Sequence, residues 1–205
     1  MKVSVIITNY NNEKLVGRAI RSAMHQDGIK REDYEILVVD DGSTDNSVFA
    51  IQQFDGSVLP IALKHNGGLS AAINKGILNS AGMFIARLDS DDYYRPLFLA
   101  IMSEFLEQNK QYAWVRCDYL IKDKDEITMG RSDKELACCY MFRRHALEAV
   151  GLYDEKLRTG ETENIMVKLL QDPAYRGRGG YINIPLYNWY KREGSLTNAG
   201  ERGQI

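Results

Sequence analysis

Short apolar runs alternate with segments of helical periodicity along the first half of the chain. Four runs rich in β-branched or aliphatic residues predict buried strands, at 3–7, 35–39, 58–63 and 83–88. Apolar residues also recur every three or four positions at 15–23 and 69–77, which predicts helices with one buried face. Strands that alternate with helices are typical of βαβ units, so we expect an α/β fold with a largely parallel central sheet flanked by helices.

Capping and helix-breaking residues predict where some of the helices begin and end. Ser43 or Thr44 is a candidate N-cap, with Asp45 in the first turn, where the helix dipole favours an anion. Gly82 is expected to end the helix before the fourth strand, and Pro96 to occupy an early position of a further helix.

The pattern becomes less regular after about residue 114. We expect a strand at 136–142, helices at 144–150 and 161–170, and an extended segment at 181–190. No repeat or linker divides the chain, so this less regular C-terminal region is predicted to belong to the same domain.

The composition is that of an ordinary folded protein. Apolar residues make up 44% and charged residues 26% of the 205 residues, which excludes disordered and fibrous classes. The formal net charge of −2 provides no field that would gather nucleic acid or anionic lipid, so no nucleic-acid partner is expected.

The uncharged segments and the cysteines indicate in which cellular compartment the protein is expected. The longest stretch without a charged residue, 179–190, has 12 residues against the roughly 20 needed to cross a bilayer, so no transmembrane span is expected. The N-terminus enters the first predicted strand directly, so no signal peptide is expected. The cysteines are odd in number and lack C-x-x-C spacing, so we expect reduced, mostly buried thiols in a cytoplasmic protein. They are Cys117, Cys138 and Cys139.

Acidic residues follow two of the predicted strands at the point where each strand ends. Asp40 and Asp41 follow the second strand, and Asp89, Asp91 and Asp92 follow the fourth. Ligands of open parallel sheets bind at the carboxyl ends of the strands, so these acids can line one crevice. The D-x-D spacing of Asp89 and Asp91 suits a divalent cation that takes its other ligands from water and phosphate oxygens. The alternative is that this segment only shapes a turn into the next helix.

Several motifs of other nucleotide- and metal-binding proteins are absent from the sequence. TNYNN at 8–12 follows the first strand in place of G-x-G-x-x-G, which argues against a dinucleotide-dependent dehydrogenase. There is no Walker A motif either. The histidines lie in separate segments, so their spacing predicts no metal cluster. They are His25, His65 and His145.

Four motifs in the first half occur in the order and spacing of a known enzyme family. They are VSVIITNYN at 3–11, VVDDGSTD at 38–45, NGGLSAA at 66–72 and LDSDD at 88–92. Together they resemble family 2 of the glycosyltransferases. The resemblance covers nearly the whole chain, because it continues more loosely through FRR at 142–144, VGLYDE at 150–155 and GE at 160–161.

The resemblance implies a GT-A fold, a nucleoside-diphosphate sugar donor, Mn²⁺ or Mg²⁺, and usually inversion at the anomeric carbon. A UDP-sugar is the default donor because uridine diphosphate is common in the family. By position, Thr8 and Tyr10 match residues around the nucleotide base, with Tyr10 available to stack on it. Asp41 matches an acid that hydrogen-bonds the base, Asp89 a residue near the ribose or diphosphate, and Asp91 the metal-binding acid.

The resemblance also divides the domain into a donor-binding half, 1–115, and an acceptor-side half, 116–205. It implies a saccharide or lipid-linked saccharide acceptor and allows peripheral membrane association. The Q-x-x-R-W signature of processive members is missing, so polymer synthesis is not expected. Tyr187, Trp189 and Tyr190 either offer aromatic faces to an acceptor sugar or pack against the sheet, and their alternation in an extended segment favours packing.

The acceptor side departs from the family pattern at two places. The family's helix near the acceptor usually begins with Glu-Asp, and that Asp is the general base, whereas this chain has Glu161-Thr162. A threonine cannot act as a base near neutral pH. Glu193 stands where relatives often carry a histidine near the metal, which leaves the third protein contact open. Two hypotheses follow: an active glycosyltransferase, or a nucleotide-sugar-binding module that has lost transfer.

Glu161 is the candidate proton acceptor if the chain is active. Glu161 and Glu163 point about 200° apart on a regular helix, so only one of them can face the donor. Gly160 gives the backbone freedom to bring Glu161 toward the place of the missing Asp. Turning Glu163 inward would instead pull Leu169 and Leu170 off the core face. The alternative is that Glu161 only stabilises the helix N-terminus and that nothing replaces the base.

Overall fold

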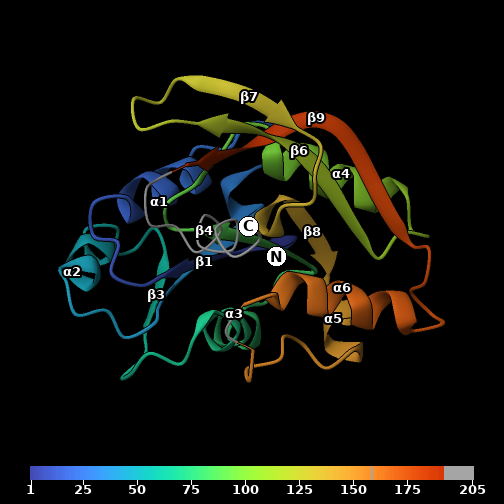
Figure 1. Cartoon of the computed structure of the whole chain (residues 1–205), viewed down its shortest axis with the longest axis horizontal. Helices are drawn as coiled ribbons and strands as arrows, with labels where there is room; N and C mark the ends of the chain where they lie inside the picture. The colour runs from blue at the N-terminus through green and yellow to red at the C-terminus, as the bar shows by residue number, and fades with distance from the viewer. Residues whose placement is uncertain (158, 192–205) are drawn as a thin grey trace, which may run out of the picture.

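The computed structural model describes residues 1–157 and 159–191 (Figure 1). Within them, nine strands form one sheet in the order β3-β2-β1-β4-β8-β6-β9-β5, and β7 pairs with β6 beside this path. The strands are β1 (Val3–Asn9), β2 (Tyr34–Asp40), β3 (Leu59–Ala62), β4 (Phe84–Asp89), β5 (Tyr93–Tyr94), β6 (Trp114–Lys122), β7 (Thr128–Ser132), β8 (Tyr140–Arg143) and β9 (Gly179–Tyr190).

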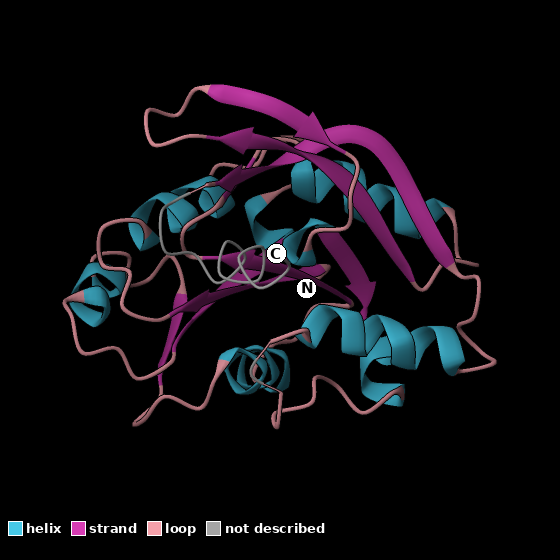
Figure 2. Cartoon of the chain, in the orientation of Figure 1, coloured by secondary structure: helices cyan, strands magenta, loops and turns pink. Residues whose placement is uncertain are grey.

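Helices lie on both sides of the central strands (Figure 2). They are α1 (Val16–Met24), α2 (Ser47–Gln52), α3 (Leu69–Leu78), α4 (Phe98–Gln108), α5 (Arg144–Ala149) and α6 (Glu161–Gln171), with short 3₁₀ turns η1 (Arg31–Asp33) and η2 (Ala137–Cys139). None of the helices in the described part of the chain is long and apolar enough to cross a membrane.

The first part of the sheet is parallel, as predicted. β1 lies between β2 and β4 and is parallel to both, with Val5 opposite Ile36 and Ala86. β3 extends this part on the far side of β2. All seven residues of β1 are buried, because helices cover both faces of a parallel sheet. The expected α/β fold with flanking helices is therefore confirmed.

From β8 onward the sheet is mixed. β8 is antiparallel to β4 and β6, β9 is parallel to β6, and β7 forms an antiparallel pair with β6. The register of β6 against β9 shifts on both sides of Asp118, and Figure 1 shows β6, β7 and β9 arched above α1 and α4. The sequence pattern predicts none of β5, β6 and β7, and the strand expected at 136–142 is a 3₁₀ turn followed by the short β8.

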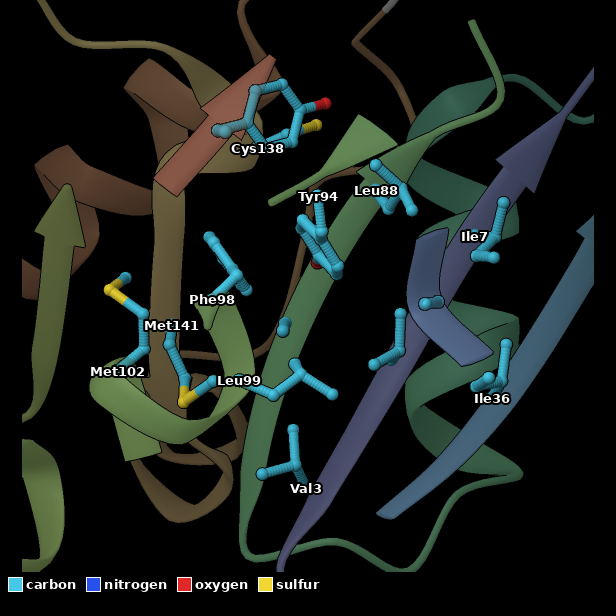
Figure 3. Close-up of a cluster of buried hydrophobic side chains, with 14 of the residues drawn as sticks. Val3, Ile7, Ile36, Leu88, Tyr94, Phe98, Leu99, Met102, Cys138 and Met141 are labelled. Atoms are coloured by element: carbon cyan, nitrogen blue, oxygen red, sulfur yellow. The ribbon is translucent and has the colours of Figure 1, made fainter. Parts of the chain in front are cut away.

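Two hydrophobic cores lie on opposite faces of the parallel strands. Val3, Val5 and Ile7 of β1 contribute to the core that contains residues of α1 and α4, part of which Figure 3 shows. Ile6 contributes to the core that contains residues of α3, α5 and α6. Successive side chains of a strand point to opposite faces, so β1 serves both cores. The strand is thereby fixed at the centre of the molecule.

The predicted start of the helix after β2 is wrong. α2 begins at Ser47, well after Ser43 and Thr44, and Asp45 precedes the helix. Asp45 Oδ1 accepts the backbone N–H of Ser47 at 2.9 Å. Ser43 is held elsewhere, because its hydroxyl donates to Asp40 Oδ2 at 2.7 Å. A side chain bonded within the loop is not available to cap a helix.

Pro96 and Gly82 also lie outside the helices that they are predicted to begin and end. α4 begins at Phe98, so Pro96 precedes it. α3 ends at Leu78, and Gly82 lies in the turn before β4. A Cβ atom at residue 82 would lie 2.4 Å from the backbone nitrogen of Ser4. Gly82 is therefore required for the close approach of two backbones rather than for ending a helix.

We expect Gly82→Ala to lower the free energy of unfolding by about 1–3 kcal/mol, because the added methyl group meets backbone that cannot rotate away. Gly130→Ala is the matched control, since a Cβ atom there meets nothing within 4 Å. Its effect is expected to stay within about 0.5 kcal/mol. Urea unfolding measures both, and equal stabilities of the two variants would contradict the close approach.

Two expectations about buried side chains are confirmed. The thiols of Cys117, Cys138 and Cys139 are all buried. Tyr187 is fully buried, and its ring makes edge contacts with Tyr94 and Phe98 at centroid distances of 5.8 and 6.4 Å. Tyr187 therefore packs in the core as predicted.

Candidate functional site

The sequence-predicted nucleotide residues gather where β2, β1 and β4 end. Thr8 lies opposite Asp89 on β4, and its Oγ1 is 3.4 Å from Asp89 Oδ1. Asp41 directly follows β2, and its N–H donates to the Asn9 carbonyl at 2.8 Å. Tyr10 directly follows β1. The parallel register thus brings residues far apart in the sequence to one edge of the sheet.

The loop after β1 presents Tyr10 to solvent and is tied to the loop after β2. The Tyr10 side chain is 49% exposed, so its ring is accessible to a base. Asn11 has a φ of 48°, a left-handed conformation that Asn tolerates better than most residues. Its N–H donates to Ser43 Oγ at 2.9 Å, and its Oδ1 accepts the N–H of Thr44 at 2.8 Å. These bonds hold the two loops together.

Asn12 connects the same loops to the acidic segment after β4. Its backbone N–H donates to Ser47 Oγ at 3.0 Å, and its Nδ2 donates to Ser90 Oγ at 2.9 Å. Asn12 is buried, and so is Asn9, whose Nδ2 donates to Asp40 Oδ2 at 2.8 Å. Sequence analysis missed both asparagines as positioning residues. Their polarity beside a buried strand was the available signal, because buried amides need partners.

Asp40 and Asp41 have different structural roles. Asp40 bonds within its own loop and to β1, as described above. Asp41 is 4% exposed, and its Oδ1 and Oδ2 accept the N–H groups of Gly67 and Gly68 at 2.7 and 2.9 Å. Asp41 thus anchors the loop that leads into α3.

Of the three acids after β4, one has a structural role and two can take part in the site. Asp92 is 4% exposed, and its carboxylate accepts the Tyr187 hydroxyl at 2.6 Å and the Tyr190 N–H at 2.8 Å. Burial, together with the charges of Asp91 and Asp89, raises the pKa of Asp92 well above its usual range. Asp92 therefore joins this segment to β9. Asp89 and Asp91 remain partly exposed and can meet a ligand.

Arg18 of α1 supports the acidic segment from the side. Its guanidinium lies over the rings of Tyr93 and Tyr190, 4.5 Å from each centroid. It donates to the carbonyl oxygen of Asp91 and forms an ion pair with Glu126 in the turn between β6 and β7. Cation–π contacts on two sides restrict the guanidinium. The backbone at Asp91 is thus held in place by a residue that sequence analysis missed.

The acidic side chains fit a divalent cation that is only partly coordinated by protein. Within the described residues, no three His, Cys, Asp or Glu side chains converge on one point. Mg²⁺ and Mn²⁺ suit oxygen ligands, and Mg²⁺ is usually bound by one or two carboxylates plus substrate phosphates. Asp89 and Asp91 meet that description. Glu193, the doubtful third contact, lies outside the described residues.

Arg87 is the most buried cation at this edge, and sequence analysis missed it. Its side chain is 4% exposed, and its Nη2 lies 3.1 Å from Asp89 Oδ1 and its Nη1 3.0 Å from Glu161 Oε1. Burial by itself would lower the pKa of Arg87, but the charges of Asp89 and Glu161 outweigh it and raise the pKa. One charged residue in the apolar run of β4 was the available signal, because a buried charge needs a partner.

The first turn of α6 faces this edge. Gly160 has a φ of 75°, a left-handed conformation that the backbone freedom of glycine allows. The Glu161 side chain is 13% exposed and turned toward Arg87, whereas Glu163 is exposed. Of the two glutamates, Glu161 is the one turned toward this edge of the sheet. Leu170, expected on the core face, is 46% exposed, because the buried stripe ends at Leu169.

Asn74 of α3 fixes the segment that leads into α6. Its Nδ2 donates to the Tyr153 carbonyl and to Glu155 Oε1, both at 2.9 Å, and its Oδ1 accepts the Tyr153 N–H at 3.0 Å. All of the side chain's hydrogen-bonding atoms are therefore used. This contact joins α3, which begins within NGGLSAA, to the VGLYDE segment.

Residues 4–165 match the sequence family described as glycosyl transferase family 2. The chain belongs to glycosyl transferase family 2. Membership confirms the resemblance seen in the four motifs of the first half. Each of these motifs contains or follows the end of one of the parallel strands β1 to β4.

The family 2 chain is similar to several bacterial proteins. It is 32% identical to the succinoglycan biosynthesis protein ExoO of Rhizobium meliloti over 223 residues, which covers 95% of this chain and 62% of ExoO. It is 35% identical to the chondroitin synthase of Pasteurella multocida over 108 residues, 51% of this chain and 11% of the synthase. The chain thus spans less than two thirds of each relative.

Two solved structures, one of them a mannosyltransferase, share the fold. Staphylococcus aureus TarS 1–349 in complex with UDP-GlcNAc superposes with a TM-score of 0.81 at 23% identity, over 97% of this chain and 61% of that one. A mannosyltransferase of Pyrobaculum calidifontis in complex with GDP-Man and Mn²⁺ gives 0.76 at 17% identity, over 98% and 60%. The family 2 chain therefore has the expected GT-A fold.

Proposed function

We propose that this chain transfers one sugar from a nucleoside-diphosphate sugar, a UDP-sugar by preference, to an acceptor hydroxyl, with metal assistance and inversion. The observation that supports it is the convergence of five residues at the carboxyl ends of β1, β2 and β4. They are Thr8, Tyr10, Asp41, Asp89 and Asp91. The relatives named above include glycosyltransferases in complex with UDP-GlcNAc and with GDP-Man and Mn²⁺.

The donor-binding half, 1–115, performs nucleotide recognition. The exposed ring of Tyr10 stacks on the base, and Asp41 accepts a hydrogen bond from it, while Thr8 and Asp89 contact the ribose and diphosphate. Asp91 holds Mn²⁺ or Mg²⁺. When bound, such a cation neutralises charge on the departing diphosphate.

The acceptor-side half, 116–205, orients the attacking hydroxyl. The acceptor is a saccharide or a lipid-linked saccharide, and a lipid-linked acceptor is bound at the membrane surface. The transfer is non-processive, so one sugar is added each time an acceptor binds. The hydroxyl attacks the anomeric carbon on the face opposite the diphosphate, and Glu161 removes its proton. Arg87 holds Glu161 Oε1, and within the described residues Glu161 Oε2 accepts no hydrogen bond, so it can take that proton.

We expect Asp41→Ala to weaken nucleotide binding by about 1–3 kcal/mol, because it removes a buried acceptor for the base. Binding of free Mn²⁺ should barely change. Asp45→Ala is the matched control, since Asp45 also accepts backbone N–H groups in this loop region, from Glu13 and Ser47. Isothermal titration with uridine diphosphate measures all three proteins, and equal affinities of the two variants would remove Asp41 from base recognition.

Thr162 supports a second candidate function, a module that binds nucleotide sugar without transfer. The Thr162 side chain is buried and lies beside Arg87, where it cannot act as a base. Release of nucleotide from UDP-sugars, measured with and without Mn²⁺, distinguishes the two functions. An enzyme releases nucleotide with turnover, whereas a binding module keeps its affinity and releases none.

A further inference from the structure

The proposed reaction assigns no role to the buried positive charge of Arg87. The residue lies in the middle of the sheet, near the end of β4, with a side chain only 4% exposed. Removing a charge from water costs free energy that opposite charges and hydrogen bonds must offset. Both partners that meet this need are side chains assigned above to the site, Asp89 and Glu161.

The hydrogen bonds of Arg87 connect the two halves of the site. On the donor side, Nε and Nη2 donate to Asp89 Oδ1 at 3.3 and 3.1 Å. On the acceptor side, Nη1 donates to Glu161 Oε1 at 3.0 Å and to Thr162 Oγ1 at 3.3 Å. A guanidinium is planar and its N–H directions are fixed, so it sets the orientation of both carboxylates at once.

We propose that Arg87 is a positioning residue for sugar transfer, holding the donor-side Asp89 and the acceptor-side Glu161 at a fixed separation through one guanidinium. The inference rests on the proposed function, because it concerns the geometry of that reaction. Arg87 does not touch either substrate in this role. It acts through Asp89 and through the first turn of α6.

A second arginine of the fold shows what a purely structural role looks like. Arg144 donates to the carbonyl oxygens of Gly82 and Ile77 at 2.7 and 2.9 Å and to Ser80 Oγ at 2.7 Å. These partners join the end of α3 to the start of β4, at the opposite edge of the sheet from the site. Arg144 thus matches Arg87 in hydrogen bonding but has no partner in the site.

The test compares steady-state turnover of the nucleotide sugar in variants of both arginines. We expect Arg87→Met to lower kcat about 100-fold, since misplacement of reacting groups by about 1 Å has an effect of that size. KM for the nucleotide sugar should rise less than about tenfold, because Tyr10, Asp41 and Asp91 still bind it. Arg87→Lys keeps the positive charge but lacks the planar guanidinium that bonds to both carboxylates, so it should give an intermediate kcat.

A double variant tests whether Arg87 acts through Glu161. If it does, adding Glu161→Gln to Arg87→Met should lower kcat far less than Glu161→Gln does in the wild type. Arg144→Met is the control, expected to lower the melting temperature while kcat per folded protein stays at the wild-type value. The same fall in kcat for both arginines would show a general loss of structure and overturn the inference.

The outcomes separate this inference from the proposed function. A wild type without turnover overturns the proposed function and this inference with it. An active wild type whose turnover survives Arg87→Met overturns the inference alone. If Arg87→Met does not fold, Arg87→Lys provides the test. A wild-type kcat in Arg87→Lys shows that a positive charge is sufficient without the planar guanidinium, which contradicts the positioning role.

Discussion

Asp91→Asn is expected to abolish the effect of Mn²⁺ on nucleotide affinity while leaving the fold intact. Asp91 is partly exposed at the carboxyl end of β4, and Arg18 holds its backbone carbonyl. Asparagine has the size of aspartate, but its neutral amide oxygen attracts a divalent cation much more weakly than a carboxylate does. The affinity for uridine diphosphate with Mn²⁺ should therefore fall to the value measured without it.

The neighbouring acid provides the control for Asp91. Asp92→Asn removes a carboxyl group one residue away, but Asp92 bonds to Tyr187 and Tyr190 and lies buried. We expect that variant to keep its response to Mn²⁺. Isothermal titration with and without the ion measures both variants. A folded Asp91→Asn protein whose affinity still rises with Mn²⁺ would rule out Asp91 as the metal-binding acid.

The second large effect is expected from Glu161→Gln, which should lower turnover by about 10²–10⁴-fold if Glu161 is the general base. Glu161 lies in the first turn of α6 with its side chain turned toward Arg87, which also pairs with Asp89. Glutamine keeps the size and can accept the hydrogen bond from Arg87, but it cannot take a proton from the acceptor hydroxyl.

Two further variants interpret the result for Glu161. Glu163→Gln changes the same residue type two positions away on the exposed side of α6 and should keep full turnover. Thr162→Asp restores the carboxylate of the family pattern beside Arg87. Full activity in Glu161→Gln would exclude Glu161 as the base. A gain in Thr162→Asp over an inactive parent would instead favour a chain that has lost transfer.

The sequence predicts the strands whose ends bring the donor-side residues together, because their signals are local. The runs that form β1, β2 and β4 are mostly apolar and rich in aliphatic residues, as is typical of strands buried on both faces. Acids at the ends of such strands then converge through the parallel register alone. Thr8 and Asp89 meet in this way although 81 residues separate them.

The remaining features depend on contacts that periodicity does not show. β6 contains Arg116 and Asp118 within an otherwise apolar run, and Asp118 is buried because Arg131 of β7 and Tyr181 of β9 bond to it. These two charged residues interrupt the apolar run, and the partners that bury Asp118 lie on other strands, where periodicity does not show them. The role of Arg87 could not be predicted for the same reason, because its partner Glu161 lies on a helix distant in the sequence.

The most direct test of the account is a crystal structure of the chain with uridine diphosphate and Mn²⁺. The account predicts the uracil ring against Tyr10 and within hydrogen-bonding distance of Asp41. It also predicts the diphosphate at the end of β4, with the ion coordinated by Asp91. A nucleotide bound away from the carboxyl ends of β1, β2 and β4 would contradict the assignment of this edge as the nucleotide-sugar site.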